Sequence, residues 1–288
     1  MNFFQKLINT YKKGLQYDNL ENKRAALAEQ LLIEQENYTL KIIDNNNLLA
    51  ELSEVNRKYE ESKKTIQELI NNKKLDIQNL KEWYENRREQ ERWTYNGGRL
   101  GNKDVRLYLI PSDYKPFTEE ATIIINKYQL TSNNNPTQII TACYKYWNLR
   151  KNWIYYTDME KYGVIDWWEN PNEALKNRHG DCESKAMVMM NTMREALKIL
   201  GHKEHYWRLT FVCSIVAGEG GHGYLTWLHD DGEYYVIEST YYEQSSFNKT
   251  WLRTPMRFNN MYQSPWGFAT LEKSWRGNNA SLMNFKDF

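Results

Sequence analysis

The strongest constraint on this chain is a long stretch that contains no helix breaker. Between Asn19 and Arg92 there is neither proline nor glycine, and Glu, Lys, Gln, Asn and Leu dominate. Because proline and glycine most often interrupt helices, the stretch is predicted to be one long helix. About 65 to 70 helical residues would reach roughly 100 Å, and a rod of that length cannot bury its apolar stripe alone. It needs a second copy, another protein, or a hairpin turn at Asp44–Asn47 that folds it on itself.

A heptad frame describes the apolar residues of this helix. Two-thirds of the positions in its two core-facing columns are apolar, which favours a coiled coil with polar interruptions. A solvated helix that packs on the rest of the chain and partial disorder are the alternatives. The first 16 residues carry apolar side chains at helical spacing and are predicted to form a short docking helix. The columns hold Ala28, Gln35, Ile42, Leu49, Asn56, Lys63, Ile70, Ile77 and Tyr84, and Leu31, Tyr38, Asn45, Leu52, Tyr59, Ile66, Lys73, Leu80 and Arg87.

The composition changes at 96–98, after which aromatic residues become frequent. We therefore predict a helical, coiled-coil arm over 1–95 and a globular domain over 96–288. The 38 Lys and Arg nearly balance the 37 Asp and Glu, so the basic excess that nucleic-acid binding requires is missing. The sequence has no apolar stretch of about 18 residues and no signal-peptide pattern at its start. A soluble protein without a nucleic-acid partner, membrane span or export signal is expected.

The globular part is predicted to mix helices and short strands, an α+β pattern. We expect a strand at 105–110, helices at 119–128 and 137–147, and a further helix that begins at Pro171. The three cysteines are an odd number without a CxxC pair, which favours reduced thiols. Cys143 lies on the apolar face of the second predicted helix and is interpreted as a buried core thiol.

Cys182 is the candidate nucleophile because it begins a well-patterned helix. Apolar residues line one side of 182–200, and Gly201 follows where a C-terminal cap glycine belongs. Backbone amides and the helix dipole at an N-terminus favour a thiolate, whereas the adjacent Asp181 and Glu183 oppose it. A cationic partner is therefore needed. If that partner forms an ion pair with the thiol, the thiol pKa should fall below its usual value of about 8.5.

His222 is the best candidate for this partner among the five histidines. It opens a strand-like run, 221–228, and its glycine neighbours leave room for another side chain. His202 and His205 lie close in sequence, but no second ligand cluster accompanies them, so no metal site and no cofactor are expected.

The following strand, 233–240, supplies a candidate carboxylate. If Asp230–Gly232 form a three-residue turn with Gly232 in the left-handed conformation, the numbers of opposed residues sum to 462. Glu238 then lies diagonally beside His222 on the same face of the sheet, whereas a two-residue turn would place it on the other face. A carboxylate there could hold the tautomer and orientation of the imidazole.

Several motifs resemble the transglutaminase-like cysteine peptidase superfamily. They are Tyr156-Thr157-Asp158, the run 167–175 (WWENPNEAL), Gly180-Asp181-Cys182-Glu183, Gly221-His222-Gly223 and the run 236–240 (VIEST). The resemblance covers about 135–245 and implies a papain-like fold in which a core helix packs on an antiparallel sheet. It also implies thiol chemistry at a peptide or amide carbonyl through an acyl-enzyme. Cys182 matches the nucleophile and His222 the base, and Glu238 stands where the family usually has aspartate.

The resulting hypothesis is a cysteine hydrolase, a peptidase or amidase, that acts on a protein or peptide and is tethered by its coiled coil. The compact versions of the family found in bacteriophages look most similar, which suggests a component of a virion or an enzyme of the host cytoplasm. The alternative is a non-catalytic structural or assembly protein of a virion that uses the papain-like domain for binding. A secreted crosslinking transglutaminase is a weaker alternative, because the sequence has no export or calcium-loop signal.

Overall fold

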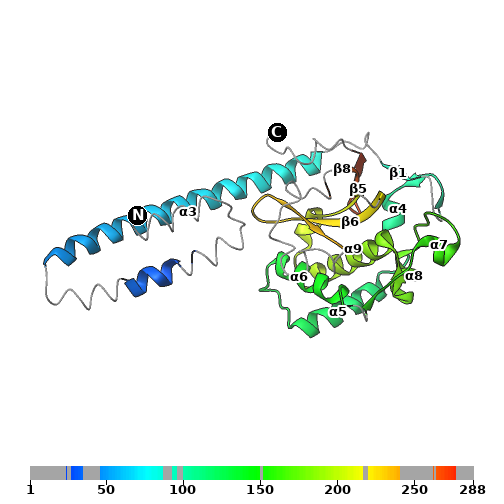
Figure 1. The fold of residues 1–288 in the computed structure, drawn as a ribbon, viewed down its shortest axis with the longest axis horizontal. Helices are drawn as coiled ribbons and strands as arrows, with labels where there is room; N and C mark the ends of the chain where they lie inside the picture. The colour runs from blue at the N-terminus through cyan, green and yellow to red at the C-terminus, as the bar shows by residue number, and fades with distance from the viewer. Residues whose placement is uncertain are drawn as a thin grey trace. The chain divides into compact units, whose positions relative to one another are not determined.

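The computed structural model describes residues 24, 27–34, 46–86, 93–95, 100–149, 152–216, 220–240, 262 and 264–276. These residues form an α+β chain in two compact units (Figure 1). The first unit holds the described residues up to Glu82 together with Asp230–Gly232, and the second holds the others. The predicted docking helix in the first 16 residues and part of the predicted turn at Asp44–Asn47 lie outside the described residues. Among the described helices, none combines the length and apolarity that a membrane crossing requires.

The first unit is helical. Helix α3 spans Asn46–Asn86, and 27–34 are also helical, so a long helix is confirmed. The buried apolar residues of this unit, Leu31, Ile66, Ile70 and Leu80, all occupy the two predicted heptad columns. The exposed surface of α3 carries ion pairs at helical spacing, such as Arg57 with Glu54 and Glu61. The coiled coil itself, with its partner, stays a prediction.

The second unit is built on a five-stranded antiparallel sheet of order β7-β6-β5-β8-β9. Helix α9 (Cys182–Ile199) packs against the central strands of this sheet. Helices α5 (Lys115–Tyr128), α6 (Pro136–Trp147) and α8 (Pro171–Asn177) pack on α9 in turn, so α9 lies between the sheet and these helices (Figure 1). The strands are β5 (Leu209–Val216), β6 (Gly220–Leu228), β7 (Tyr234–Ile237), β8 (Ser264–Ala269) and β9 (Ser274–Arg276).

Local signals explain why these helices begin and end where they do. Asn135 and Asn170 accept backbone N–H bonds at the starts of α6 and α8, each ahead of a proline that suits the first helical position. Gly201, at φ +87, follows α9 and confirms the predicted cap. All of 183–197 in α9 are buried, so this helix forms the centre of the core. Cys143 is fully buried on α6, as predicted.

The strand predicted at 105–110 is wrong, because 106–109 form a short helix, α4 (Arg106–Leu109). The buried residues are Val105, Tyr108 and Leu109, which follow helical spacing, whereas Leu107 is 49% exposed. The Asp104 carboxylate accepts the backbone N–H of Arg106 at the start of this turn. Apolar side chains in nearly every position hide such a pattern in the sequence.

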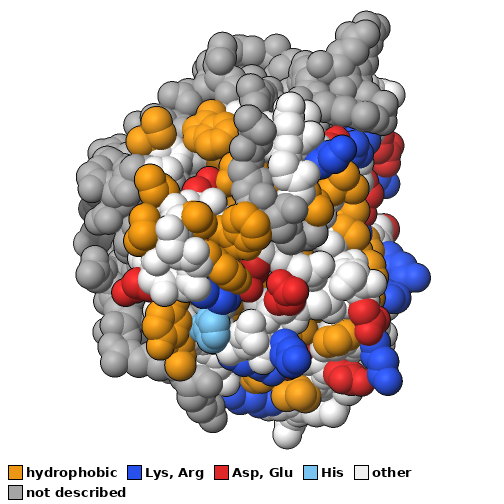
Figure 2. Space-filling model, turned by 90° about the vertical axis from the view of Figure 1, so that its right-hand side faces the viewer, with side chains coloured by type: hydrophobic (Ala, Val, Ile, Leu, Met, Phe, Trp, Pro, Cys, Tyr) orange, Lys and Arg blue, Asp and Glu red, His pale blue; other side chains and the backbone are white. Residues whose placement is uncertain are grey.

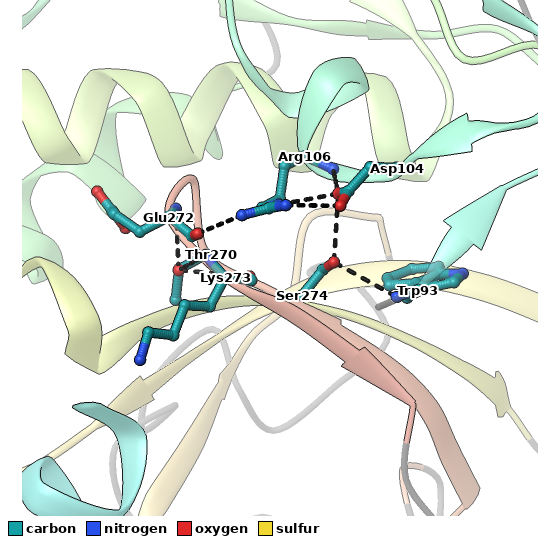
Figure 3. A network of polar contacts seen from close by, with 7 residues as sticks. All are labelled: Trp93, Asp104, Arg106, Thr270, Glu272, Lys273 and Ser274. Carbon is teal, nitrogen blue, oxygen red and sulfur yellow. Dashed lines mark hydrogen bonds and ion pairs between the residues drawn. The ribbon is translucent and has the colours of Figure 1, made fainter. Parts of the chain in front are cut away.

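A polar network joins the start of the second unit to the β8–β9 hairpin (Figure 3). Asp104 pairs with the Arg106 guanidinium and accepts the Ser274 hydroxyl, while the Ser274 oxygen accepts the Trp93 N–H. Arg106 also donates to the Glu272 carbonyl. Trp93 is 1% exposed, and its ring lies so close to Gly267 that a Cβ there would approach it to 2.9 Å.

The end of α3 is anchored to the same hairpin. The Tyr84 hydroxyl lies 2.7 Å from the Thr270 hydroxyl in a buried contact. The Lys273 ammonium donates to the carbonyls of Tyr84 and Glu85, which are unsatisfied at a helix C-terminus. The second unit therefore begins at Trp83, whereas the boundary at 95/96 was inferred from composition. That boundary stays a prediction, which truncation can test.

We predict that a fragment of 83–288 melts cooperatively, and that a fragment of 93–288 folds with a lower melting temperature. The shorter fragment loses the buried Tyr84 side chain, and truncating a large core residue typically costs about 3 kcal/mol. Tyr84→Phe in the whole chain should cost only about 1 kcal/mol, because it removes one hydrogen bond. Thermal and denaturant unfolding measure all three. Equal stability of the two fragments would contradict the anchoring role of Tyr84.

Candidate functional site

Cys182 is positioned by a tight connection that leads into α9. Strand β4 (His179–Gly180) pairs in parallel with β3 (Ile154–Tyr155) and is followed by Asp181 at the N-cap position. Gly180 has φ +152, and a Cβ on it would lie 2.7 Å from the Ser184 Cβ. Only glycine fits this turn, which places Cys182 at the first position of the helix.

The Cys182 thiol lies against strand β6. It donates to Glu183 Oε2 at 3.1 Å and accepts the backbone N–H of Gly223 at 3.4 Å. A Cβ on Gly223 would approach the Glu183 Cβ to 3.0 Å, so the missing side chain allows α9 to come this close. The Ser239 hydroxyl donates to the Cys182 carbonyl, which links the end of β7 to the same helix turn. Two strands and a helix end therefore meet at the thiol.

The structure confirms the predicted register of the β6–β7 hairpin. Leu225 pairs with Ile237 and Leu228 with Tyr234, so opposed numbers sum to 462. Gly232 has φ +79, the left-handed conformation expected in the three-residue turn. His222 Nε2 lies 3.0 and 3.1 Å from the two carboxylate oxygens of Glu238, as the diagonal arrangement predicts.

Strand β7 is shorter than predicted. It ends at Ile237, so Glu238 lies one residue beyond the ladder. A strand that continued to residue 240 with the sum of 462 would pair His222 with Thr240, and this part of the prediction is wrong. The reason is that the Thr240 backbone N–H donates to the Glu238 side chain. Beyond Ile237 the backbone bonds locally to the carboxylate and leaves the ladder.

Glu238 is a fully buried carboxylate that is satisfied from several directions. It accepts hydrogen bonds from the Tyr262 hydroxyl and the Thr240 N–H in addition to its contact with His222. Burial raises its pKa, but the charge and hydrogen bond of His222, together with the hydrogen bonds from Tyr262 and Thr240, outweigh burial and lower the pKa. The Tyr224 ring stacks on the imidazole with centroids 5.7 Å apart. The imidazole is therefore fixed by a carboxylate at its edge and by an aromatic ring on its face.

Sequence reasoning missed Tyr262 and Tyr224. Tyr224 follows His222 by two residues on the same strand, so strand alternation could have placed it on the same face. Tyr262 lies outside the hairpin, and no spacing rule connects it to Glu238. Burial raises its pKa, and the neighbouring Glu238 charge raises it further, so the hydroxyl stays protonated and donates.

A lowered thiol pKa is expected only where a cationic partner forms an ion pair with the thiol, and that expectation stays a prediction. Burial, and then the charges of Glu183 and Asp181, hold the pKa of Cys182 well above its usual range. The negative charges of Asp181 and Glu183 thus disfavour the thiolate, as expected from the sequence. In the described part of the chain, the thiol forms hydrogen bonds with Glu183 and Gly223, and the imidazole of His222 contacts Glu238. The pairing of Cys182 with His222 stays a prediction.

An acidic cluster surrounds the thiol. Burial and then the charge of Asp181 raise the pKa of Asp158 to about 7. Burial also raises the pKa of Asp181, and that of Glu183 lies well above its usual range through burial and the Asp181 charge. One oxygen from each of Asp158, Asp166 and Glu183 lies within 4.8 Å of the others. Asp158 and Glu183 are buried and Asp166 is exposed. Buried carboxylates that repel one another hold protons or bind a cation.

Among the residues that the structure describes, three groups have donor atoms close enough to ligate a metal. Two of them share Glu183: one is Asp158, Asp166 and Glu183, whose oxygen ligands suit a hard divalent cation, and the other is Asp181, Cys182 and Glu183. Glu183 Oε1 is buried without a hydrogen-bond partner. The third group is His202, Glu204 and His205. Arg208 Nη1 lies 3.3 Å from His205 Nδ1, and this permanent positive charge disfavours a metal there. The expectation of a metal-free protein stays a prediction.

We predict that the stability of the protein falls with rising pH through the titration of Asp158. Its folded pKa of about 7 exceeds its ordinary value of 3.8, so between these pH values the folded state holds a proton that the unfolded state has lost. Asp158→Asn should remove this dependence and become increasingly stable relative to the parent from pH 5 to pH 8. Denaturant unfolding at both pH values measures it, with the exposed Asp113→Asn as control. A constant difference between parent and Asp158→Asn would contradict the assignment.

No family model matches the sequence, and no curated protein matches it. Among solved structures, the chain is similar to Legionella pneumophila LapG in an EGTA-treated form, with 16% identity, 60% of this chain and 90% of that chain covered, and a TM-score of 0.41. The calcium-bound form of LapG is 16% identical, with 64% of this chain and 93% of that chain covered and a TM-score of 0.38. A proposed cysteine protease from Cytophaga hutchinsonii is 14% identical, with 46% of this chain and 41% of that chain covered and a TM-score of 0.29. These likenesses are structural and of low identity, and their TM-scores below 0.5 assign no activity.

Proposed function

We propose that this chain is a cysteine hydrolase that cleaves a peptide or amide bond through an acyl-enzyme. Cys182 is the nucleophile, His222 the base and Glu238 the residue that orients the base. The observation that carries the proposal is the buried contact between His222 Nε2 and Glu238 Oε2, at 3.0 Å. The residue after His222 on strand β6 is Gly223, whose backbone N–H donates to the Cys182 sulfur. A histidine held by a carboxylate beside a thiol at a helix N-terminus is the arrangement that thiol catalysis requires.

In this proposal each nitrogen of the imidazole has its own role. Nε2 is directed at Glu238, so this nitrogen carries the proton that the carboxylate accepts, and Nδ1 is the basic nitrogen. Nδ1 takes the thiol proton, and the sulfur attacks the carbonyl carbon. The imidazolium then gives its proton to the departing amine, which leaves an acyl group on Cys182. Water, activated by the same nitrogen, releases the acid and restores the thiol.

The helix N-terminus contributes to the step in which charge develops on the carbonyl oxygen. The backbone N–H of Cys182 lies in the first turn of α9, where amides have no partner within the helix. Such amides stabilise an oxyanion, and the helix dipole adds to their effect. Asp181 and Glu183 act against the preceding step, because their negative charge next to the sulfur disfavours formation of the thiolate.

Neutralising the acidic cluster would therefore favour catalysis. A divalent cation held by Asp158, Asp166 and Glu183 would supply positive charge close to the sulfur, and protons on the carboxylates would remove negative charge. In either case the thiol pKa falls and the nucleophile becomes available. Tethering by a coiled-coil arm is a further part of the proposal. A virion location stays an expectation from the sequence resemblance alone.

The proposal predicts a specific pattern of thiol reactivity. Iodoacetamide should label Cys182 slowly at neutral pH and faster as the pH rises, because the thiol pKa is raised. Glu183→Gln should shift the rate profile to lower pH by removing a neighbouring charge. His222→Ala should slow labelling because the base is lost, and Glu238→Gln should slow it less because the imidazole stays. Labelling rates by mass spectrometry over a pH series measure this.

The buried Cys143 and Cys213 provide internal controls and should be labelled only on unfolding. Hydrolysis of peptide and amide substrates should vanish in Cys182→Ala and in His222→Ala. If the Cys182 rate profile is the same in the parent, Glu183→Gln and His222→Ala, the hydrolase assignment fails, and a binding role for the domain takes its place.

A further inference from the structure

Helix α7 (Asp158–Tyr162) has a reversed polarity. Asp158 is 3% exposed, whereas its neighbour Met159 is 54% exposed. A surface helix normally turns acids to water and apolar side chains to the core. The residues on both sides of α7 also expose large apolar groups, and Ile165 is 89% exposed. We call this set the apolar face: Ile154, Tyr155, Tyr156, Met159, Val164 and Ile165.

The apolar face belongs to a well-anchored segment. Thr157 and Glu160 form a reciprocal capping box at the start of α7. The Lys161 ammonium lies 2.8 Å from both oxygens of the buried Glu169 and also donates to the His179 carbonyl. Asp158 accepts the Trp167 N–H. The polar groups of the segment are thus used to hold it in place, while its apolar groups are presented to solvent.

The same segment borders the candidate nucleophile. The Tyr156 N–H donates to the Gly180 carbonyl at 3.2 Å, two residues before Cys182. At the other end, the carboxylates of Asp158 and Asp166 lie within 4.8 Å of that of Glu183, which follows Cys182. A polypeptide that covers the apolar face would therefore pass close to the residues that flank Cys182.

Negative charge lies along this border. The segment 154–167 contains Asp158, Glu160 and Asp166 and one cation, Lys161, which is paired with Glu169. Figure 2 shows the side of the molecule at which α7 lies, where apolar side chains are interspersed with Asp and Glu and with Lys and Arg. An apolar surface rimmed by polar groups marks an interaction site, and its charge selects the partner.

We propose that the apolar face binds the substrate chain, an extended polypeptide segment with large apolar side chains and an adjacent Lys or Arg. The apolar side chains of the substrate cover the apolar face, and its cation lies against Asp166, the exposed member of the group formed with Asp158 and Glu183. This inference rests on the proposed hydrolase function for the bond that is cut. The binding step itself does not depend on the reactivity of the thiol.

The test is a binding measurement on the full chain with Cys182→Ala, which prevents turnover. Three fluorescent synthetic peptides of equal length are compared: one with apolar residues and a lysine, one with the lysine replaced by glutamate, and one with the apolar residues replaced by serine. The first should bind about tenfold or more tightly than each of the others. Met159→Ser with Ile165→Ser should weaken its binding about tenfold. Ile123→Ser, on α5 and 50% exposed in the parent, is the matched control and should leave binding unchanged.

Equal binding of the three peptides, or binding that Met159→Ser with Ile165→Ser does not change, would overturn the inference. So would a self-associated protein that these substitutions convert to monomers without an effect on peptide binding, as sedimentation would show. Peptide binding that requires the apolar face, in a protein whose Cys182 labelling ignores His222, would support the binding surface and reject the hydrolase assignment. The two proposals therefore fail on separate measurements.

Discussion

The close approach of the α9 N-terminus to strand β6 is the constraint on which the site depends. Gly223 makes it possible, because any side chain there would collide with Glu183. The approach brings the Cys182 sulfur to a strand backbone and removes water from two carboxylates and an imidazole at once. Charges interact more strongly when water is excluded. The raised pKa values of Cys182 and Glu183 and the buried contact of His222 with Glu238 all follow from this packing of the α9 N-terminus on strand β6.

Features with a local physical signature could be predicted from the sequence. The start and end of α9 follow from the residues around Cys182 and Gly201, and the helices α6 and α8 follow from apolar spacing and from prolines at their starts. Helix α5 was predicted over 119–128, but it begins four residues earlier, at Lys115. The register of the β6–β7 hairpin follows from the chemistry of a three-residue turn that ends in glycine. Each of these depends on a few neighbouring residues, so one sequence contains the information.

Features that depend on distant contacts could not be predicted. Tyr262 reaches Glu238 from outside the hairpin, and the carboxylates of Asp158, in helix α7, and of Asp166 lie close to that of Glu183. The sequence places these carboxylates far apart, so their proximity is known only from the structure. Helix α4 was missed for a different reason: its sequence is apolar on nearly every side, so only burial distinguishes a helix from a strand.

The three-residue turn at Asp230–Gly232 gives the site a weakness that is remote from its chemistry. Side chains alternate between the two faces of a sheet, so the length of a turn decides to which face each following residue of the strand points. Adding or removing one residue at the turn would leave both strands and every side chain of the site in the sequence, yet Glu238 would point to the wrong face. Homologous chains with a conserved cysteine, histidine and glutamate could therefore differ in competence through a single insertion, and turn length is as informative as residue identity when such sequences are compared.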